Sequence, residues 1–300
     1  MVRRSTRVHD GHDNRILSRP SPLQRAYSTI NDDADDKPPW CRNESSSGTD
    51  PKSTWRYGSG ANDGGESLSK SHIEIDPFAE GRPMFHNYSL LVSGIVPRPI
   101  GFVSTISKDG KENLAPFSYF QCVDHDPPVF VIGFSGRPDR PKDTLQNLEE
   151  TGECSINVVS EHMIEAVNAT SIDAPRGTSE WAISGLHQAP SSTVKPPRVR
   201  EAVFSIEGRL IEAIDYKTSR PAVRNKGKLA IIEATRFWAR EDAIDEKRSS
   251  LDLNVLKPVG QLGGSSYARI TDTFEVVRKN WKTAMANDGP ELSELTKGKD

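Results

Sequence analysis

Short apolar segments separated by tight turns are the feature that most restricts how this chain can fold. The triplet Lys-Asp-Gly at 108–110 is a turn signal between two such segments, and two prolines precede a third. Apolar runs of this length, bounded by turn residues, are typical of β-strands. The predicted strands cover residues 100–107, 113–123, 129–134, 154–159, 203–215 and 228–240.

Two short helices are predicted among these strands. The sequence KDTLQNLEETG at 142–152 has helical periodicity, with Asp143 and Gln146 at the spacing of a capping box and Gly152 as the end signal. A second helix is predicted over residues 161–170. Many strands, few helices and close turns predict a mainly β fold, an antiparallel sheet or β-barrel with short helices over its ends.

The first 70 residues lack the apolar content of a packed domain. They are rich in Ser, Asp, Gly, Arg and Pro, which predicts a disordered N-terminal tail over 1–70. Six arginines and two aspartates lie in the first thirty residues, and Arg25 precedes Ser28 by three positions, as at a mitochondrial processing site. A mitochondrial transit peptide and a plain basic tail both fit this pattern. We expect one domain over 71–278 and a polar C-terminal tail over 279–300.

Composition excludes several classes of protein. A net charge of −3 and a pI near 6.2 give no reason to expect nucleic acid or an anionic membrane surface as a partner. No apolar run approaches the roughly 20 residues needed to cross a bilayer. Three cysteines without a CxxC motif predict no disulfide framework, and therefore a reducing compartment such as the cytoplasm or the mitochondrial matrix. Cys122 and Cys154 are predicted to be buried, inert thiols.

Motifs for metal binding or covalent catalysis are absent from the sequence. The seven histidines are scattered, so no metal site is predicted. Neither GxSxG nor a phosphate-binding GxxxxGK[ST] loop occurs. We therefore assign no catalytic residue from the sequence.

The segment NLAPFSYF, residues 113–120, carries almost no charge between two strand-like runs. Pro116 prevents ordinary pairing in a central strand, and Ala115 is small enough for a ligand to approach the backbone. Phe117 and Phe120 can pack near a flat ring, while Asn113 and Ser118 can bond its polar edge. This composition suits the wall of a site for a planar aromatic cofactor. The alternative is that the aromatic residues belong only to the core.

A phosphate-binding site is predicted at residues 140–144, RPKDT. Lys142 supplies charge, and Thr144 with the N–H groups of the first helical turn supplies donors. The alternative is a surface helix capped by Asp143.

Three further residues are candidates for the same ligand. Ser104 and Thr105 end an apolar strand, where their hydroxyls can bind sugar-alcohol or phosphate oxygens or only cap the strand. Arg98 stands between two prolines and either reaches a phosphate or lies at the surface.

Four segments, in this order and spacing, resemble the flavin reductase-like family, whose fold is an FMN-binding split barrel of Greek-key type. They cover residues 97–271 and read PRPIGFVSTISKDGKENLAPFSYF, DPPVFVIGF, KDTLQNLEETGECSINVV and PVGQLGGSSYARI. The resemblance implies a homodimer that binds FMN near the subunit interface. Gln261 stands where we expect an arginine, which weakens anion pairing at that position.

The resemblance also implies a reaction, the transfer of a hydride from NAD(P)H to flavin, with a partner monooxygenase or another protein as electron acceptor. The flavin itself carries this chemistry, which agrees with the absence of an evident acid–base pair. A flavin-binding electron carrier without turnover is the alternative. A third hypothesis is a barrel that has lost flavin, which Gln261 favours. The sequence does not distinguish NADH from NADPH.

Overall fold

The computed structural model describes residues 55–136, 141–217, 227–274, 276 and 278–297. Its strands are β1 (Gly101–Ile106), β2 (Glu112–Phe117), β3 (Phe120–His125), β4 (Pro128–Phe134), β5 (Glu153–Val158), β6 (Gln188–Ala189), β7 (Arg198–Val199), β8 (Phe204–Asp215), β9 (Lys228–Ala239), β10 (Val259–Gly263) and β11 (Ser266–Arg269). Its helices are η3 (Glu66–Ser69), α2 (Met84–Gly94), α3 (Asp143–Thr151), η4 (Glu161–Met163), α4 (Ile164–Ala169), α5 (Glu180–Ser184), α6 (Leu253–Leu256) and α7 (Trp281–Thr296). The predicted mainly β fold with short helices is confirmed.

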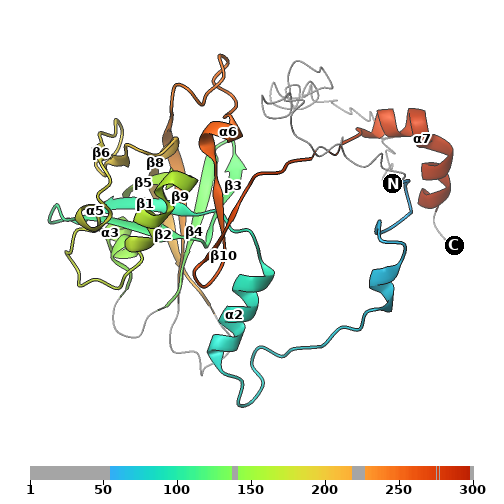
Figure 1. Cartoon of the computed structure of the whole chain (residues 1–300), viewed down its shortest axis with the longest axis horizontal. Helices are drawn as coiled ribbons and strands as arrows, with labels where there is room; N and C mark the ends of the chain where they lie inside the picture. Colours follow the sequence, from blue (N-terminus) through green and yellow to red (C-terminus); the bar gives the residue numbers. More distant parts are fainter. Residues whose placement is uncertain (1–54, 137–140, 218–226, 275, 277, 298–300) are drawn as a thin grey trace, which may run out of the picture. The chain divides into compact units, whose positions relative to one another are not determined.

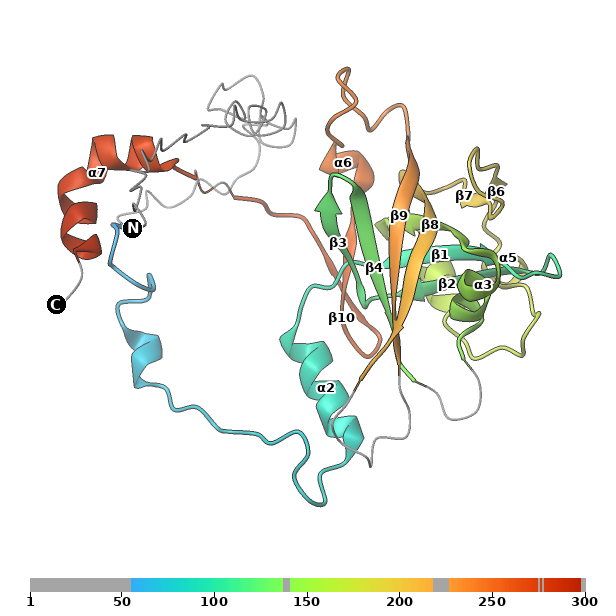
Figure 2. The ribbon, with the colours of Figure 1, turned by 180° about the vertical axis from the view of Figure 1, so that it is seen from behind.

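One predicted strand, residues 113–123, is in fact two. β2 ends at Phe117 and β3 begins at Phe120, and these strands form opposite edges of a seven-stranded antiparallel sheet with the order β2-β1-β5-β8-β9-β4-β3. The prediction of a single strand was wrong because a hydrophobic pattern does not reveal a corner at which the chain changes edge. Since only two residues separate the edges in the chain, the sheet must curl until they approach each other, as Figures 1 and 2 show.

The edge position of β2 agrees with its proline. Pro116 lies opposite Phe102 of β1, and no strand pairs with the other side of β2 among the described residues. Proline cannot donate a backbone hydrogen bond, so it is tolerated at a sheet edge. One side of the segment 113–117 is therefore left to contact helices and loops.

Alternating side chains of β1 point into two separate apolar clusters. Val103 belongs to the cluster inside the curled sheet, where Leu145 and Leu148 of α3 also pack. Phe102 belongs to a second cluster, which includes Leu114 and residues of α4 and α5. Helix α3 is thereby fixed against the inner cluster and α4 and α5 against the outer one. Both sets of helices border β2.

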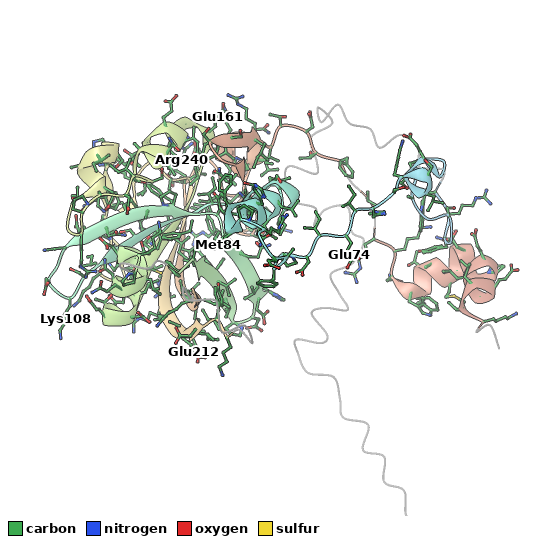
Figure 3. The ribbon with its side chains drawn as sticks, turned by 90° about the horizontal axis from the view of Figure 1, so that it is seen from below. Glu74, Met84, Lys108, Glu161, Glu212 and Arg240 are labelled. Carbon is green, nitrogen blue, oxygen red and sulfur yellow. The ribbon has the colours of Figure 1, made fainter. Side chains whose placement is uncertain are left out.

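Helix α2 exposes most of its apolar side chains. Met84, labelled in Figure 3, is 80% exposed, Phe85 is 67% exposed and Ile95 at the C-cap is 61% exposed, whereas Val92 is buried. Soluble chains rarely leave a contiguous apolar surface of this kind uncovered unless it contacts a partner.

The two flanks of the predicted domain are described in part. Residues 1–54, which include the predicted processing site at Arg25, lie outside the described residues. Residues 55–70 contain turns and η3, with no buried residue. The predicted polar C-terminal tail contains α7, which has a non-helical residue at Asp288, two positions before Pro290. No described helix is both long and apolar enough to cross a membrane.

The two described cysteines differ in environment. Cys154 is buried in the inner cluster, which confirms its predicted burial, and burial, helped by Glu153, raises the pKa of its thiol to about 12. Cys122 is exposed, so its predicted burial was wrong. It lies on β3, an edge strand whose residues after Phe120 are all exposed.

Candidate functional site

Two clefts meet at β2 and share the lining residues Pro116, Phe117 and Lys142. The polar cleft, about 110 Å³, is lined by residues 113, 115–117, 141–144, 170–174 and 180. The aromatic cleft, about 190 Å³, is lined by residues 88, 92, 116–119, 133–135 and 142. Ligand pockets usually measure about 300–1,000 Å³. Either cleft alone is therefore small for a nucleotide, whereas the two together approach the lower limit.

Helix α3 begins at the polar cleft. Lys142 is the extended N-cap residue, with φ −62° and ψ 136°, and Asp143 is the first helical residue. The predicted cap by Asp143 was wrong, because the helix starts one residue too early for the capping-box spacing and no side chain caps it. The N–H groups of a first helical turn lack intrahelical partners and form the positive end of the helix dipole. This end of α3 therefore offers backbone donors to the cleft, with Lys142 at its rim.

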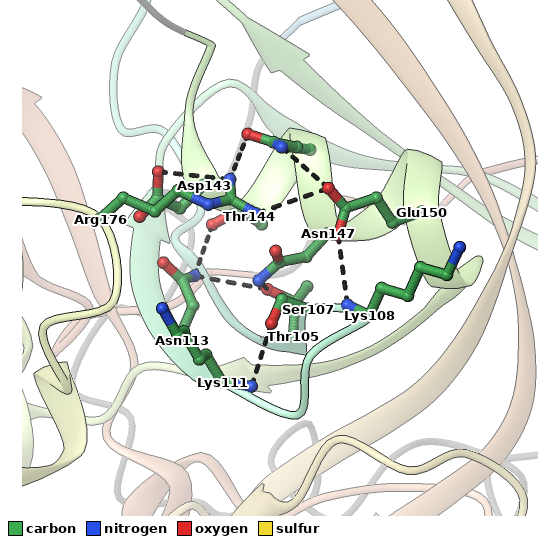
Figure 4. A network of polar contacts seen from close by, with 11 residues as sticks. Thr105, Ser107, Lys108, Lys111, Asn113, Asp143, Thr144, Asn147, Glu150 and Arg176 are labelled. Atoms are coloured by element: carbon green, nitrogen blue, oxygen red, sulfur yellow. Dashed lines mark hydrogen bonds and ion pairs between the residues drawn. The ribbon is translucent and has the colours of Figure 1, made fainter.

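A buried hydrogen-bond network, the cleft cluster, lies beneath this helix start and consists of Thr105, Asn113, Thr144 and Asn147 (Figure 4). The Asn113 side-chain amide donates to Thr144 Oγ1 at 2.8 Å and to Thr105 Oγ1 at 3.4 Å. Asn147 donates to the same Thr105 oxygen at 3.1 Å. Because Thr144 Oγ1 accepts from Asn113, its own O–H is available as a donor. Thr144 is only 1% exposed, yet it lines the polar cleft.

Ser104 and Thr105 line neither cleft, although Thr105 belongs to the cleft cluster. Thr105 Oγ1 accepts the two amide hydrogen bonds described above. Ser104 is fully buried on the face of β1 that carries Phe102, and its Oγ has no partner among the described residues. The structure therefore brings Asn113 and Thr144 to the polar cleft and places the two β1 hydroxyls behind it.

Arg98 is a buried residue that holds other segments together. It is 7% exposed, and its Nη1 donates to the carbonyl oxygens of Val92 at 2.6 Å, Ile95 at 2.7 Å and Leu262 at 3.3 Å. Its Nε donates to Ser118 Oγ at 3.3 Å. Arg98 therefore lines neither cleft, but it positions Ser118, which lines the aromatic cleft. A cation at the C-terminal end of α2 also suits the helix dipole.

Gln261 lies beside Arg98 through two backbone hydrogen bonds, at 3.0 and 2.9 Å. Its side chain donates to the carbonyl oxygen of Gly264 at 2.8 Å, within the turn between β10 and β11. The residue that departs from the expected arginine thus stabilises a hairpin turn and does not line either cleft.

The segment NLAPFSYF divides between the clefts and the core. Ala115 is half-buried, lines the polar cleft and packs against the inner cluster. Pro116 and Phe117 line both clefts, and the Phe117 ring meets Phe134 edge to face at 4.9 Å. Phe120 lines neither cleft and stacks on Phe130 in the core, so for this residue the core interpretation holds.

Several cleft residues were not found from the sequence. Glu180 of α5 is buried, lines the polar cleft and accepts the N–H of Leu114 at 3.2 Å. Burial raises the pKa of Glu180, and nearby Asp143 adds to the rise, so this carboxyl stays protonated to a higher pH than usual. Tyr88 of α2 lines the aromatic cleft. Glu180 follows Ser179 in what reads as an ordinary helix start, so the sequence offered no signal for it.

The described residues contain no group of three or more His, Cys, Asp or Glu side chains that could hold a metal ion. The clefts offer an apolar wall at β2, backbone and hydroxyl donors at α3, and a lysine between the two.

Comparison with known proteins identifies the family of this chain. Residues 93–254 match the family described as "Flavin reductase like domain". An uncharacterized relative from Halalkalibacterium halodurans is 35% identical over 195 residues, which are 64% of this chain and 90% of that protein.

Solved structures are similar over the same region. Nitrilotriacetate monooxygenase component B from Bacillus cereus is 30% identical with a TM-score of 0.64, covering 69% of this chain and 100% of that one. A split-barrel protein from Shewanella frigidimarina, 20% identical with a TM-score of 0.56, shares the fold over 67% of this chain and 94% of its own. The chain therefore belongs to the flavin reductase-like family and has its split-barrel fold.

Proposed function

We propose that this protein binds FMN across the two clefts and acts as an NAD(P)H-dependent oxidoreductase of the flavin reductase type. The observation that carries the proposal is the position of Lys142, which lines both clefts at the start of α3. A flavin mononucleotide needs an apolar wall for its ring and cationic and N–H donors for its phosphate, and β2 and α3 offer these on either side of Lys142.

The polar cleft supports binding of the phosphate. Lys142 supplies a positive charge, Thr144 a hydroxyl donor and the first turn of α3 its N–H groups. Asn113 acts through Thr144, because its amide hydrogens are already donated to Thr144 and Thr105. In this proposal Asn113 positions a ligand contact, and Thr105 anchors Asn113.

The aromatic cleft supports binding of the ring. Pro116 and Phe117 form its wall, Ala115 leaves room beside them, and Ser118 faces the cleft while Arg98 holds its hydroxyl. When bound, flavin supplies the acceptor for a hydride from NAD(P)H. The residues of this chain orient the ring and exclude water from one of its faces, and we assign no proton-transferring residue.

We further propose two kinds of partner, a protein that accepts the electrons and a second copy of this chain. The 30% identity to a monooxygenase component supports a partner monooxygenase, or another protein, as the electron acceptor. The exposed apolar side chains of α2 and the exposed edge strand β3 support a homodimer that covers them. Because Tyr88 and Val92 of α2 line the aromatic cleft, that dimer interface would border the ring. We also propose that the protein is located in the cytoplasm or the mitochondrial matrix. The three cysteines without a CxxC motif support a reducing compartment, and the six arginines of residues 1–30 support the matrix.

Two measurements test the function. The absorbance spectrum of the purified full chain should show bound flavin, or FMN should bind on titration. Oxidation of NADH or NADPH by the chain with FMN should then exceed that by FMN alone. Flavin binding without such turnover would favour the electron carrier, and failure to bind any flavin would refute the proposal.

A further inference from the structure

We propose that the loop of residues 170–179, fastened to α3 by Arg176, restricts the site to flavin mononucleotide and excludes the dinucleotide FAD. This inference rests on the proposed function and adds a specificity-determining segment to it. Residues 170–174 of this loop form a wall of the polar cleft, where the phosphate would lie.

Arg176 fastens the loop to the first two turns of α3 (Figure 4). Its guanidinium donates to Gln146 Oε1, lies 3.5 Å from Glu150 Oε1 and lies 4.0 Å from Asp143 Oδ1. Isolated surface ion pairs contribute little to stability. A planar guanidinium that contacts three oxygens of one helix nevertheless fixes the position of the loop that carries it.

Further contacts make the fastening specific. Glu150 also accepts the backbone N–H of Lys108 at 3.2 Å and the side-chain amide of Gln146 at 2.8 Å, so the turn between β1 and β2 joins the same network. Gly177 has a φ of +86°, and a Cβ placed on it would lie 3.2 Å from Lys111 Nζ. Glycine therefore lets the loop turn tightly against this lysine, immediately after Arg176.

Both ends of the loop are fixed as well. Thr170 Oγ1 donates to the carbonyl oxygen of Val167 at 2.7 Å. At the other end, Glu180 accepts the N–H of Leu114 in β2 at 3.2 Å. With its ends and its middle held, the loop cannot move away from the cleft without breaking the contacts of Arg176.

The size and charge of the polar cleft favour one phosphate over two. The cleft measures about 110 Å³, and Lys142 is the one cation among the described residues that line it. FAD would bring a second phosphate and an adenosine to the same end. The second phosphate would find no further cation among the described lining residues, and the adenosine would meet the fastened loop.

The test is the ratio of FMN to FAD affinity in the full-length protein, measured by titration with FMN, FAD and riboflavin. The wild type should bind FMN at least about tenfold more tightly than FAD, or about 1.4 kcal/mol. In Arg176→Gln the ratio should fall below about threefold, because FAD binds better while FMN and riboflavin change little. Arg209→Gln is the matched control, since Arg209 contacts Glu153 and the Thr193 carbonyl and lines neither cleft.

A second variant breaks the same fastening from the helix side. Glu150→Gln removes one partner of Arg176 and leaves Arg176 itself in place. It should also lower the ratio of FMN affinity to FAD affinity, and it provides the test if Arg176→Gln folds poorly. If the wild type bound FMN and FAD with equal affinity, this inference would be overturned, but the proposed function would stand. A loss of FMN affinity in Arg176→Gln, with riboflavin binding and melting temperature unchanged, would also overturn it, because Arg176 would then contact the phosphate. A wild type that binds no flavin would refute the proposed function itself.

Discussion

Two groups of hydrogen-bonded polar side chains, the cleft cluster around Thr144 and a second group around the buried Glu207, differ in the hydrogen-bond donors that they leave unused. In the cleft cluster, Thr144 accepts from Asn113 and keeps its O–H as a donor beside the polar cleft. The first N–H groups of α3 add further donors there, since no side chain caps the helix.

The second group, the Glu207 cluster, consists of Ser192, Thr193, Glu207 and Trp238 and is saturated. The Glu207 carboxylate is fully buried and accepts from the N–H groups of Ser192 at 2.8 Å and Thr193 at 2.6 Å, from the Thr193 hydroxyl at 2.5 Å and from the Trp238 indole at 2.6 Å. Arg198 lies over the Trp238 ring at 3.7 Å. Every acceptor position of the carboxylate is thus occupied by the protein itself.

The difference separates a structural role from a binding role. A saturated cluster holds segments together, here β8, β9 and the residues before β7, and leaves no hydrogen-bonding group of Glu207 for a ligand. A cluster that faces a cleft and keeps unused donors can bind an anion. Substitutions in the Glu207 cluster should therefore change the free energy of unfolding, and substitutions at the clefts should change ligand affinity.

The largest effect should come from Glu207→Ala. Removing the buried carboxylate takes the acceptor from the donors of Ser192, Thr193 and Trp238, and water can replace it only in part, so we expect a loss of about 2–4 kcal/mol in the free energy of unfolding. Urea unfolding measures it. Glu212→Ala, on the exposed part of the same strand (Figure 3), should change stability by less than about 0.5 kcal/mol. FMN affinity of the folded Glu207→Ala protein should be unchanged; a large loss of affinity would remove the distinction between the clusters.

The same carboxylate should make stability depend on pH. Burial alone would raise the pKa of Glu207, but the hydrogen bonds from Thr193, Ser192 and Trp238 outweigh burial and hold it at about 2, below the ordinary 4.5. A folded-state pKa below the unfolded value stabilises the protein above about pH 4.5, and this contribution is lost as the pH falls toward 2. Unfolding at pH 7, 4.5 and 3 should show a steeper decline in the wild type than in Glu207→Gln. Parallel declines would contradict the assignment.

At the polar cleft, Lys142→Ala should weaken FMN binding and leave riboflavin binding nearly unchanged, because riboflavin has no phosphate. The lost charge-assisted contact is worth about 1.5–3 kcal/mol, roughly ten- to hundredfold in affinity. Lys228→Ala removes the same charge from a lysine that pairs with Glu149 on α3 and lines neither cleft, and it serves as the control. Equal weakening of both flavins in Lys142→Ala would move the phosphate to another place.

A smaller effect is expected at the wall of the site. Ala115→Leu should lower FMN affinity at least about tenfold, or about 1.4 kcal/mol, with little change in the melting temperature of the flavin-free protein. Ala213→Leu, a half-buried alanine of β8 outside both clefts, is the matched control. If residue 115 were only core, overpacking would instead cost about 1–3 kcal/mol of stability and the folded protein would bind FMN normally.

Much of the barrel could be predicted from the sequence, because β1, β4, β5, β8 and β9 each lie in a separate run of strand-forming residues. The corner at residues 118–119 could not, since β2 and β3 read as one continuous run. Helix α3 and its Gly152 end were predicted correctly, but its cap was not, because a shift of one residue changes which side chain stands at the N-cap.

The sequence also predicted only part of the candidate site. Asn113, Ala115, Pro116, Phe117, Ser118, Lys142 and Thr144 line the clefts, because neighbours on one edge strand or one helix start remain neighbours in the fold. Arg98, Ser104 and Thr105 do not, since the direction of a side chain depends on strand pairing that a local pattern does not contain. Glu180 and the loop at 170–174 reach the polar cleft through tertiary packing alone.

The most direct test of the central claim is a crystal structure of the full-length protein with FMN. We predict a phosphate oxygen within hydrogen-bonding distance, about 2.7–3.2 Å, of Thr144 Oγ1 and of an N–H group in the first turn of α3. The ring should lie against Pro116 and Phe117, and the Glu207 cluster should be unchanged. A phosphate bound outside the polar cleft, with Thr144 making no contact to it, would contradict the account.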